Sequence, residues 1–372
     1  MTRPQVALAH DYLTQLGGAE RVVLALSRTF PGAPLHTTVH ESGTTYAELD
    51  GLDIHTTALQ HLAPFRRNPR LALPLLAPAA GHHHIDAEVT ICNTTGWAHG
   101  MPVSGAKVVY AHNTPRWLYQ RDEYLANLPR WYGWGLTPLH RPLLRWDRRA
   151  AASADLVVAG SAVARDRIHR NWGRDAEVLC PPPGLSADGE QQPVAAVEPG
   201  YLLTVARLLP YKRVDVVVDA VAARPGARLL VVGDGPDRER LAGRVAAAGA
   251  SDRVRFLTDV SDAQLRWLYA NAAALVTAAQ EDFGLTPLEA MGFGTPVVAI
   301  DAGGFRETVV DGVTGLLFAS PDAASLGRSL DRAAATDWPA EELKARAEEF
   351  SEASFAARFH QLVASVRADS TS

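Results

Sequence analysis

The sequence predicts an α/β protein with two domains, each built on a mainly parallel β-sheet. Three observations support this fold class. The chain has 372 residues, which is long for a single hydrophobic core. Short apolar runs alternate with segments of helical periodicity in both halves, as in proteins whose parallel strands are joined by helices. A stretch rich in Pro, Gly, Gln and Ala, from Cys180 to Gly200, interrupts this alternation near the middle of the chain.

The N-terminal half opens with a strand over residues 5–9, a loop that ends in Gly17 and Gly18, and a helix over residues 19–28. Strand, glycine-containing loop and helix in this order begin a βαβ unit. The pair of glycines would let a ligand approach the backbone just before a helix N-terminus, although a simple turn explains the same letters. Further strands are expected at 34–39, 53–56, 87–92, 107–110 and 156–159, and helices at 138–152 and 162–172.

The alternation restarts after the proline-rich stretch. We therefore place an N-terminal domain at 1–182, a linker at 183–199 and a C-terminal domain at 200–350. The expected elements of the C-terminal domain are strands at 201–206, 228–233, 254–257, 273–277 and 296–300, with helices at 214–223, 238–248 and 262–271 and two further helical runs at 322–335 and 341–350.

Composition excludes several classes of protein. A hydrophobic content of 47% and a charged content of 21% are typical of a globular domain, and the net charge of −5 gives no general electrostatic reason to bind nucleic acid. Cys92 and Cys180 form no C-x-x-C pair. No run approaches the roughly 20 apolar residues that span a bilayer, and the N-terminus lacks a signal-peptide pattern. We expect a cytoplasmic protein.

Residues 62–80 combine Arg66, Arg67 and Arg70 with a run of Leu, Pro and Ala. One interpretation is a basic amphipathic segment that contacts an anionic membrane surface. The other, which we favour, is a proline-broken helix packed on the sheet. The neighbouring triplet His82–His84 is not expected to bind a metal, because adjacent side chains point in different directions.

Several charged residues follow predicted strands, where open α/β sheets bind ligands. His112 and Arg116 follow the strand at 107–110, and Arg207 and Lys212 follow the first strand of the second domain. A loop with two cations suits a diphosphate. The sequence around Gly233 lacks the third glycine of a dinucleotide-binding fingerprint, and no G-x-x-x-x-G-K-S/T loop is present.

The stretch Glu281–Gly304 carries two carboxylates, Glu281 and Glu289, on either side of a predicted loop-to-helix transition. Thr286 is the expected helix cap, and Pro287 suits a first helical position. The helix start would hold an anion, and the carboxylates would accept sugar hydroxyls. The structural alternative is a capping box, in which Glu289 only ties the helix end.

These motifs resemble those of the GT-B-fold retaining glycosyltransferases of family four. The most specific are VARLLPYKRVD, VGDGPDRERL, EDFGLTPLEAMGFGTPVVA and GGFRETVVDGVTGLLF in the C-terminal half. HDYLTQLGGAERV and YAHNTPRWLY in the N-terminal half are similar to a bacterial mannosyltransferase-like branch that builds surface polysaccharides. The resemblance implies two Rossmann-like domains that face each other across a cleft, with residues 351–372 forming a helix that returns to the N-terminal domain and a frayed tail.

The resemblance also implies roles for individual residues. Glu281 would touch donor-sugar hydroxyls and Glu289 the ribose, while Arg207 and Lys212 would neutralise the diphosphate and His112 would lie near the reacting sugar. Two motif departures, Thr277-Ala278 and Asn113-Thr114-Pro115, leave these charged residues in place. The remaining expected contacts are Gly17, Gly18, Val260, Phe283, Gly284 and Leu285 to the donor, and, on the acceptor side, His10, Asp11, Arg116 and Tyr119.

The implied activity is metal-independent transfer of a hexose, mannose from GDP-mannose, to a glycan, lipid-linked or small-molecule acceptor. No cofactor beyond the sugar nucleotide is expected, and no nucleic-acid partner. Alternatives are a UDP-sugar-dependent transferase, a GT-B-fold phosphorylase or epimerase, and a non-catalytic binding module with a relict site. A peripheral membrane contact through residues 62–80, at the inner face of the membrane, is a further expectation.

Overall fold

The computed structural model describes residues 5–121 and 137–370. The chain divides into two compact units. One contains the residues up to Pro182 together with those from Glu352 onward, and the other runs from Pro183 to Ser351.

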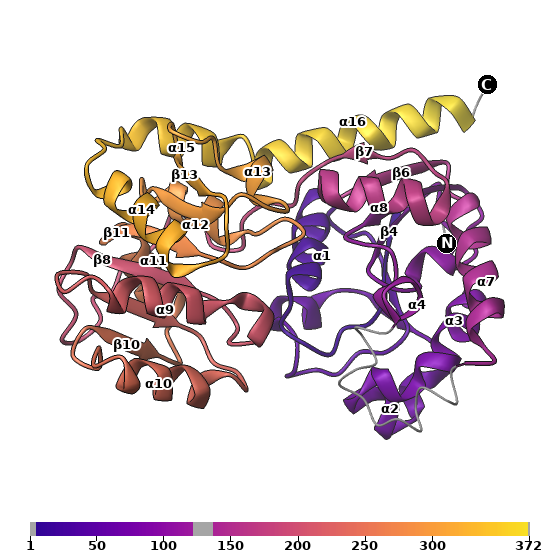
Figure 1. The fold of residues 1–372 in the computed structure, drawn as a ribbon. Coiled ribbons are helices and arrows are strands. Elements are labelled where there is room, and N and C mark those ends of the chain that lie inside the picture. Colours follow the sequence, from indigo (N-terminus) through magenta and orange to yellow (C-terminus); the bar gives the residue numbers. More distant parts are fainter. Residues whose placement is uncertain (1–4, 122–136, 371–372) are drawn as a thin grey trace. The chain divides into compact units, whose positions relative to one another are not determined.

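The N-terminal unit is built on a seven-stranded sheet in the order β3-β2-β1-β4-β5-β6-β7 (Figure 1), and every pair of neighbouring strands is parallel. The order reverses at β1 and β4, so these strands mark the switch point where open α/β sheets bind ligands. The strands are β1 (Val6–His10), β2 (Leu35–Thr37), β3 (Ile54–Thr56), β4 (Val89–Thr94), β5 (Ala106–Ala111), β6 (Leu156–Ala159) and β7 (Glu177–Val178).

Successive residues of these strands point to opposite faces, and each face has its own hydrophobic core. Cys92 and Val109 lie in one core, which is covered by helices α3 (Leu73–Gly81), α4 (Arg116–Tyr119), α7 (His140–Ala152) and α8 (Ala162–Trp172). Ile91 and Tyr110 lie in the other core, against α1 (Gly18–Thr29) and α16 (Glu352–Ser370). Short 3₁₀ segments complete the unit: Ala47–Gly51, Ala58–His61, Pro69–Ala72 and Ala98–Gly100.

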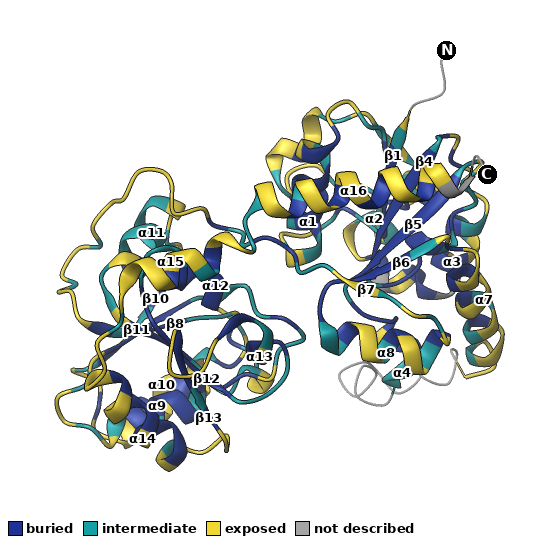
Figure 2. Cartoon of the chain, turned by 90° about the horizontal axis from the view of Figure 1, so that it is seen from above, coloured by how far each residue is buried: buried dark blue, intermediate teal, exposed yellow. Residues whose placement is uncertain are grey.

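Helix α16 belongs to the N-terminal unit although it is the last element of the chain. It packs along α1 (Figure 2), and Phe355 and Phe359 bring their rings against Tyr110 of β5. The helix continues to Ser370, so the described part of the expected tail is helical. The last two residues lie outside the described residues.

The C-terminal unit is built on a six-stranded parallel sheet in the order β10-β9-β8-β11-β12-β13. Its helices form two groups with the sheet between them (Figure 2): α9, α10 and α14 on one side, and α11, α12 and α15 on the other. The strands are β8 (Tyr201–Val205), β9 (Leu229–Val232), β10 (Val254–Leu257), β11 (Ala272–Thr277), β12 (Val297–Ile300) and β13 (Gly315–Phe318). The helices are α9 (Val214–Ala222), α10 (Arg238–Ala247), α11 (Asp262–Ala270), α12 (Thr286–Gly292), α13 (Phe305–Thr308), α14 (Ala323–Ala334) and α15 (Ala340–Glu348).

The expected linker contains bends and a turn, and it is packed on the C-terminal unit. Its backbone is held along its length: Gly184 N–H donates to Glu289, Gln192 N–H to the Ala263 carbonyl at 3.0 Å, and Arg255 to the Ala195 carbonyl at 3.1 Å. Residues 183–199 are therefore part of the C-terminal unit rather than a free tether.

Residues 62–80 form a broken helical segment, as the prolines predict. It comprises α2 (Ala63–Arg67), the 3₁₀ turn at Pro69–Ala72 and α3. Leu73 and Leu76 are buried in the core, whereas Leu71 and Leu75 are about half exposed, at 49% and 47%. The segment packs on the unit with one side and leaves apolar side chains in solvent on the other.

Candidate active site

Lys212 and Glu281, which are 69 residues apart in the sequence, form an ion pair in the C-terminal unit. Each follows a strand: Lys212 ends the loop after β8, and Glu281 lies in the loop between β11 and α12. Because β8 and β11 are parallel neighbours, both loops leave the same edge of the sheet. Arg207, on the same loop as Lys212, is exposed to solvent.

Two glycines that follow β12, Gly303 and Gly304, pack closely against the loop that carries Glu281. Gly304 N–H donates to the Glu281 carbonyl at 3.0 Å. A Cβ atom on Gly303, which has φ +60°, would lie 2.1 Å from that carbonyl oxygen, and one on Gly304 would lie 2.2 Å from the Phe283 Cα. No residue with a side chain fits this approach, which explains why the motif ends in two glycines.

The backbone at Gly284 turns sharply between Phe283 and α12. Gly284 has φ +82°, and a Cβ there would lie 2.4 Å from the ring of Phe305. Phe283 itself is buried and packs near Phe350, with ring centroids 6.0 Å apart. The segment expected to offer backbone contacts to a donor is thus anchored by its side chains.

Glu289 differs from its expected geometry. The N-cap of α12 is Leu285, and no side chain caps this helix, so the capping box with Thr286 does not form. Glu289 is buried, and its two oxygens accept hydrogen bonds from the Tyr269 hydroxyl at 2.7 Å and from Gly184 N–H at 3.2 Å. Thr286 is already the first helical residue, which is why its side chain cannot act as the cap.

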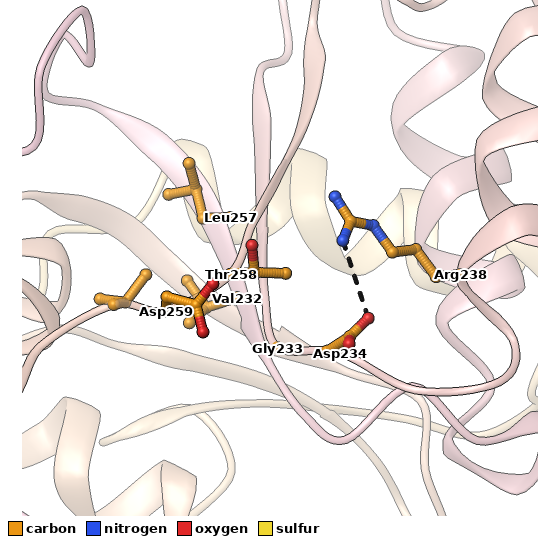
Figure 3. Close-up of a pocket in the computed structure, with 8 residues that line it drawn as sticks. Val232, Gly233, Asp234, Arg238, Leu257, Thr258 and Asp259 are labelled. Carbon is orange, nitrogen blue, oxygen red and sulfur yellow. Dashed lines mark ion pairs between the residues drawn. The ribbon is translucent and has the colours of Figure 1, made fainter.

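A pocket of about 350 Å³ opens at the ends of β9 and β10. Figure 3 shows its apolar residues Val232 and Leu257 and, at its edge, the ion pair of Asp234 with Arg238, 3.7 Å apart. The lining also includes Gly233, Thr258, Asp259 and the predicted donor contact Val260.

The pocket is joined to the loop that carries Lys212. A Cβ on Gly233 would lie 2.1 Å from the Ala206 carbonyl oxygen, and one on Gly235 would lie 2.2 Å from that of Leu208. Leu208 N–H also donates to the Asp234 carbonyl at 2.9 Å. The two glycines of the G-D-G-P motif therefore bring the pocket and the cationic loop together.

His112 directly follows β5 in the N-terminal unit. It belongs to a cluster of polar side chains, only some of which were predicted from the sequence. Its Nε2 is 2.7 Å from Oδ1 of Asn93, the second-last residue of β4. The Asn93 amide nitrogen donates to the Ala19 carbonyl at 3.0 Å. Burial, together with the nearby charge of His10, lowers the pKa of His112 to about 4, so its imidazole is neutral at neutral pH.

His10 and Glu20 form a buried pair beside this histidine, with His10 Nε2 3.6 Å from a Glu20 oxygen. Burial lowers the pKa of His10, but the hydrogen bond and charge of Glu20 outweigh it, and the pKa lies above its ordinary value. The second Glu20 oxygen has no hydrogen-bond partner and lies where a Cβ of Gly17 would be, 2.3 Å away. Gly17 is the N-cap of α1 and Gly18 its first residue.

Asp11 has a structural role in its own unit. Its carboxylate is buried and accepts hydrogen bonds from the backbone N–H groups of Thr95 at 2.6 Å, Trp97 at 2.9 Å and Ala98 at 2.7 Å. Burial raises the pKa of Asp11, but His10 and these N–H groups outweigh it and hold the pKa below its usual range. Asp11 therefore positions the loop after β4.

Arg116 is the first residue of α4 and Tyr119 is the last. The Tyr119 hydroxyl donates to the buried carboxylate of Asp147 at 2.7 Å, as Trp172 does from its indole, and His99 is 3.0 Å from the same carboxylate. Tyr119 is thus part of a buried network, whereas Arg116 is exposed.

Asn93, Glu20 and Tyr269 were not among the predicted site residues. Asn93 and Glu20 could have been predicted from their positions. Asn93 directly follows the predicted strand at 87–92, and Glu20 lies two residues after Gly18. No sequence pattern indicated Tyr269, because its contact with Glu289 depends on how α11 packs on α12.

The structure describes no cluster of three His, Cys, Asp or Glu side chains that could hold a metal ion. His83 instead faces His36, with 2.9 Å between Nε2 and Nδ1, and His36 stacks on His55. None of the described helices has the length and apolar character to cross a bilayer.

The fold is that of GT-B glycosyltransferases. Sucrose-phosphate synthase from Thermosynechococcus elongatus is similar with a TM-score of 0.74 at 20% identity, over 99% of this chain and 100% of that chain. HepE from Anabaena, solved in complex with UDP-glucose, is similar with a TM-score of 0.68 at 20% identity, over 97% of this chain and 99% of that chain. The predicted class of two parallel-sheet α/β domains is confirmed.

Residues 188–351 match the family model of glycosyl transferases group 1. Two D-inositol 3-phosphate glycosyltransferases are also similar in sequence. That of Actinosynnema mirum is 36% identical over 213 residues, which cover 50% of this chain and 51% of the relative. That of Frankia alni is 37% identical over 164 residues, which cover 40% of this chain and 38% of the relative. The chain spans about half or less of the length of these relatives. The matches support a glycosyltransferase enzyme; the mannosyltransferase branch stays a prediction.

Proposed function

We propose that this protein is a retaining glycosyltransferase that transfers a hexose from a nucleoside-diphosphate sugar to a glycan, lipid-linked or small-molecule acceptor, with GDP-mannose as the donor. The observation that carries the proposal is the Lys212–Glu281 ion pair, whose lysine lies on a loop joined to a pocket of about 350 Å³. This arrangement lies within the segment that matches the group 1 glycosyl transferases.

The ion pair has the two functions that a donor requires. A diphosphate would attract the Lys212 ammonium, and Glu281 would then be free to accept hydrogen bonds from sugar hydroxyls. Arg207 is exposed on the same loop and can add a bidentate phosphate contact. When the bond to the sugar breaks, negative charge grows on the phosphate oxygens, and the two cations stabilise it.

The pocket beside this loop supports a purine-containing donor. Val232 and Leu257 offer apolar surface for a flat ring, and the carboxylates of Asp234 and Asp259 line the same space. Guanine presents adjacent N–H donors that a carboxylate accepts, whereas uracil presents a single N–H between two carbonyl groups. Asp259 has φ +53°, in the left-handed region that few residues other than glycine adopt, and it lines the pocket.

His112 supplies a neutral imidazole in the N-terminal unit. A neutral ring can accept a hydrogen bond from a sugar hydroxyl without adding positive charge near the anomeric carbon, where positive charge develops in the transition state. Retention of configuration follows from the resemblance to family four and is part of the proposal.

Equilibrium binding tests the proposal most directly. Purified protein is titrated with GDP, UDP and ADP, with a chelator present, and donor turnover is then measured with and without acceptor. We expect GDP to bind with a Kd between about 1 μM and 1 mM. Absence of binding by all three diphosphates would refute the proposal, and turnover that requires orthophosphate would identify a phosphorylase instead.

Glu281→Ala tests the role of the carboxylate. We expect turnover to fall by at least about 100-fold, as when one preorganised polar group is removed from an active site, with the fold unchanged. Glu341→Ala is the matched control, because Glu341 also pairs with a lysine, Lys344 at 3.1 Å, but at an exposed position of helix α15. Near-normal turnover in the Glu281 variant would make Glu281 a structural residue.

A UDP-sugar is the second candidate donor. It is favoured by the UDP-glucose complex of the structural neighbour HepE. Because the curated relatives are named for D-inositol 3-phosphate, this compound belongs in the acceptor panel. The exposed leucines Leu71 and Leu75 favour the proposed peripheral membrane contact of residues 62–80, at the inner face of the membrane.

A further inference from the structure

A buried carboxylate lies in the first turn of helix α1. Glu20 is the third residue of this helix and is 1% exposed. One of its oxygens accepts a hydrogen bond from the Gln15 amide at 3.0 Å and lies 3.6 Å from Nε2 of His10. The other oxygen is buried and has no hydrogen-bond partner among the residues that the structure describes. A buried carboxylate of this kind is unfavourable unless a cation lies beside it.

The general preference of helix starts for acids does not explain the burial of Glu20. Glu239 of α10 and Glu342 of α15 also lie in first turns, and both are exposed. An exposed acid interacts favourably with the helix dipole and stays in water. The group that offsets the burial of Glu20 is instead His10, which is equally buried.

His10 is placed between two oxygen atoms. It ends β1, with Nδ1 2.9 Å from the Asn93 carbonyl oxygen and Nε2 facing Glu20. A carbonyl and a carboxylate both accept, so the arrangement suits an imidazolium, which carries a proton on each nitrogen. Asp11 and His112 are the other titratable groups near this ring, and Asp11 acts in the same direction as Glu20.

The charged ring fixes Asn93, and Asn93 in turn contacts His112. The Asn93 side-chain nitrogen donates to the Ala19 carbonyl at 3.0 Å, and the side-chain oxygen is 2.7 Å from Nε2 of His112. The same side-chain nitrogen is 3.0 Å from Nδ1 of His10. A His10 ring without a proton on Nδ1 would accept from this nitrogen and lose its bond to the Asn93 carbonyl. The charge of His10 therefore decides which group of Asn93 it holds.

Gly17 leaves the space that the carboxylate occupies. A Cβ on Gly17 would lie 2.3 Å from the unpaired oxygen of Glu20, whereas a Cβ on Gly18 would have no described atom within 4 Å. The backbone of Gly17 is extended, with φ −127°, so its conformation does not require glycine. The position of the Glu20 carboxylate does.

We propose that Glu20 is a positioning residue for His112. Its carboxylate holds the His10 imidazolium, the imidazolium holds the Asn93 carbonyl, and the Asn93 side chain presents its oxygen to His112. The first turn of α1 thereby connects the Gly17–Gly18 loop to the imidazole within one unit of the protein. The role in turnover rests on the proposed function, in which His112 lies near the reacting sugar, whereas the contacts do not.

Nitrogen-15 NMR of the histidine rings in the full chain tests the contacts without an activity assay. We expect native His10 to titrate above pH 6.5. Glu20→Gln removes the charge and keeps the shape and an acceptor, so the pKa of His10 should fall by about 2 units. The signal of the His112 Nε2 proton, which reports the hydrogen bond to Asn93, should move in the same variant.

Gly17→Ala displaces the carboxylate by a second route. The new methyl group takes the place of the unpaired Glu20 oxygen, so the pKa of His10 should fall by at least about 0.5 units here too. Gly18→Ala is the matched control, because its methyl group enters open space. Glu342→Gln controls for the loss of an acid from a first turn. Neither control should change the pKa of His10 by more than about 0.2 units.

Turnover measures the consequence for the proposed reaction. Glu20→Gln should lower kcat at least about tenfold and leave the KM for the donor within about twofold, because a displaced imidazole affects the reacting sugar more than donor binding. His10→Gln should cause a similar loss. The double variant should lose little more than either single variant, because the two residues act through one contact.

Three results would overturn the proposal: an unchanged pKa of His10 in Glu20→Gln, equal shifts in the Gly17 and Gly18 variants, or losses of kcat that multiply in the double variant. Absence of transfer by the native chain would instead refute the proposed function. The His10 and His112 signals would then still decide whether Glu20 positions the ring.

Discussion

Replacing Asn93 by Asp is expected to turn His112 from a neutral imidazole into one that titrates near neutral pH. In the native protein the Ala19 carbonyl accepts from the Asn93 amide nitrogen, so Oδ1 must face His112. An amide oxygen only accepts, and His112 therefore carries its proton on Nε2, 2.7 Å away, and leaves Nδ1 as a hydrogen-bond acceptor.

The expected shift follows from Coulomb's law. A carboxylate about 4 Å from the imidazolium charge stabilises it by about 4 kcal/mol at an effective dielectric of about 20. One pKa unit corresponds to about 1.4 kcal/mol, so the pKa of His112 should rise by about 2–3 units from its native value of about 4. Below the new pKa the ring is charged, and turnover of the proposed reaction should fall.

Nitrogen-15 NMR of the imidazole rings measures both the tautomer and the titration, without relying on activity. Native His112 should show the Nε2–H tautomer from about pH 5 upward. The matched control is Asn271→Asp, since the Asn271 amide nitrogen donates to the Trp267 carbonyl in the C-terminal unit. The reasoning is refuted if His112 of the Asn93 variant titrates within about half a unit of the native protein, or if the native tautomer is Nδ1–H.

Three further substitutions test the framework of the two units. Gly303→Ala should destabilise by about 2–4 kcal/mol in urea unfolding, because the new methyl group meets the Glu281 carbonyl at a positive φ. Tyr269→Phe should lower the free energy of unfolding by about 1.5–3 kcal/mol, because the buried Glu289 carboxylate loses a donor. Burial, with the neighbouring charges of other histidines, lowers the pKa of His36 to about 3, so the unfolded chain binds its proton first as the pH falls below about 6.5. His36 should therefore contribute up to about 2 kcal/mol to the loss of stability between pH 6.5 and 5, and His36→Asn should remove that contribution.

Each of these changes has a matched control. Gly249 has φ +61° with open space around it, so Gly249→Ala should lose only about 1 kcal/mol. Tyr201→Phe removes a buried hydrogen bond to an uncharged carbonyl, at a loss of about 1 kcal/mol. His169 is largely exposed and lies outside the group of His36, His55 and His83, so His169→Asn should leave the contribution of His36 in place. Equal effects in a variant and its control would contradict the corresponding explanation.

The sequence predicted the sheet edge of the candidate site well, because the relevant residues follow strands. Lys212 and Glu281 come after apolar runs that had to be parallel strands of one sheet, so their meeting needed no knowledge of side-chain packing. The pair Gly303 and Gly304 is also apparent in the sequence. The close approach of the Glu281 carbonyl, which requires glycine at position 303, is not.

Contacts that depend on packing between helices could not be predicted. Thr286 is followed by Pro287 and precedes Glu289 in the spacing of a capping box, yet the helix begins one residue too early for that box. The hydrogen bond to Tyr269 depends on the placement of α11. The roles of the predicted donor and acceptor residues stay predictions that the binding and turnover experiments address.

The position of α16 has a consequence for how the protein is made. Five apolar residues of this helix, Phe355, Phe359, Leu362, Val363 and Val366, complete a core whose other members lie before residue 180. During synthesis the whole C-terminal unit is therefore made before α16 can join α1 and complete the cover over this face of the sheet. An N-terminal fragment expressed alone would expose that apolar face, and residues 352–370 would have to be fused to it or added as a peptide for the unit to fold.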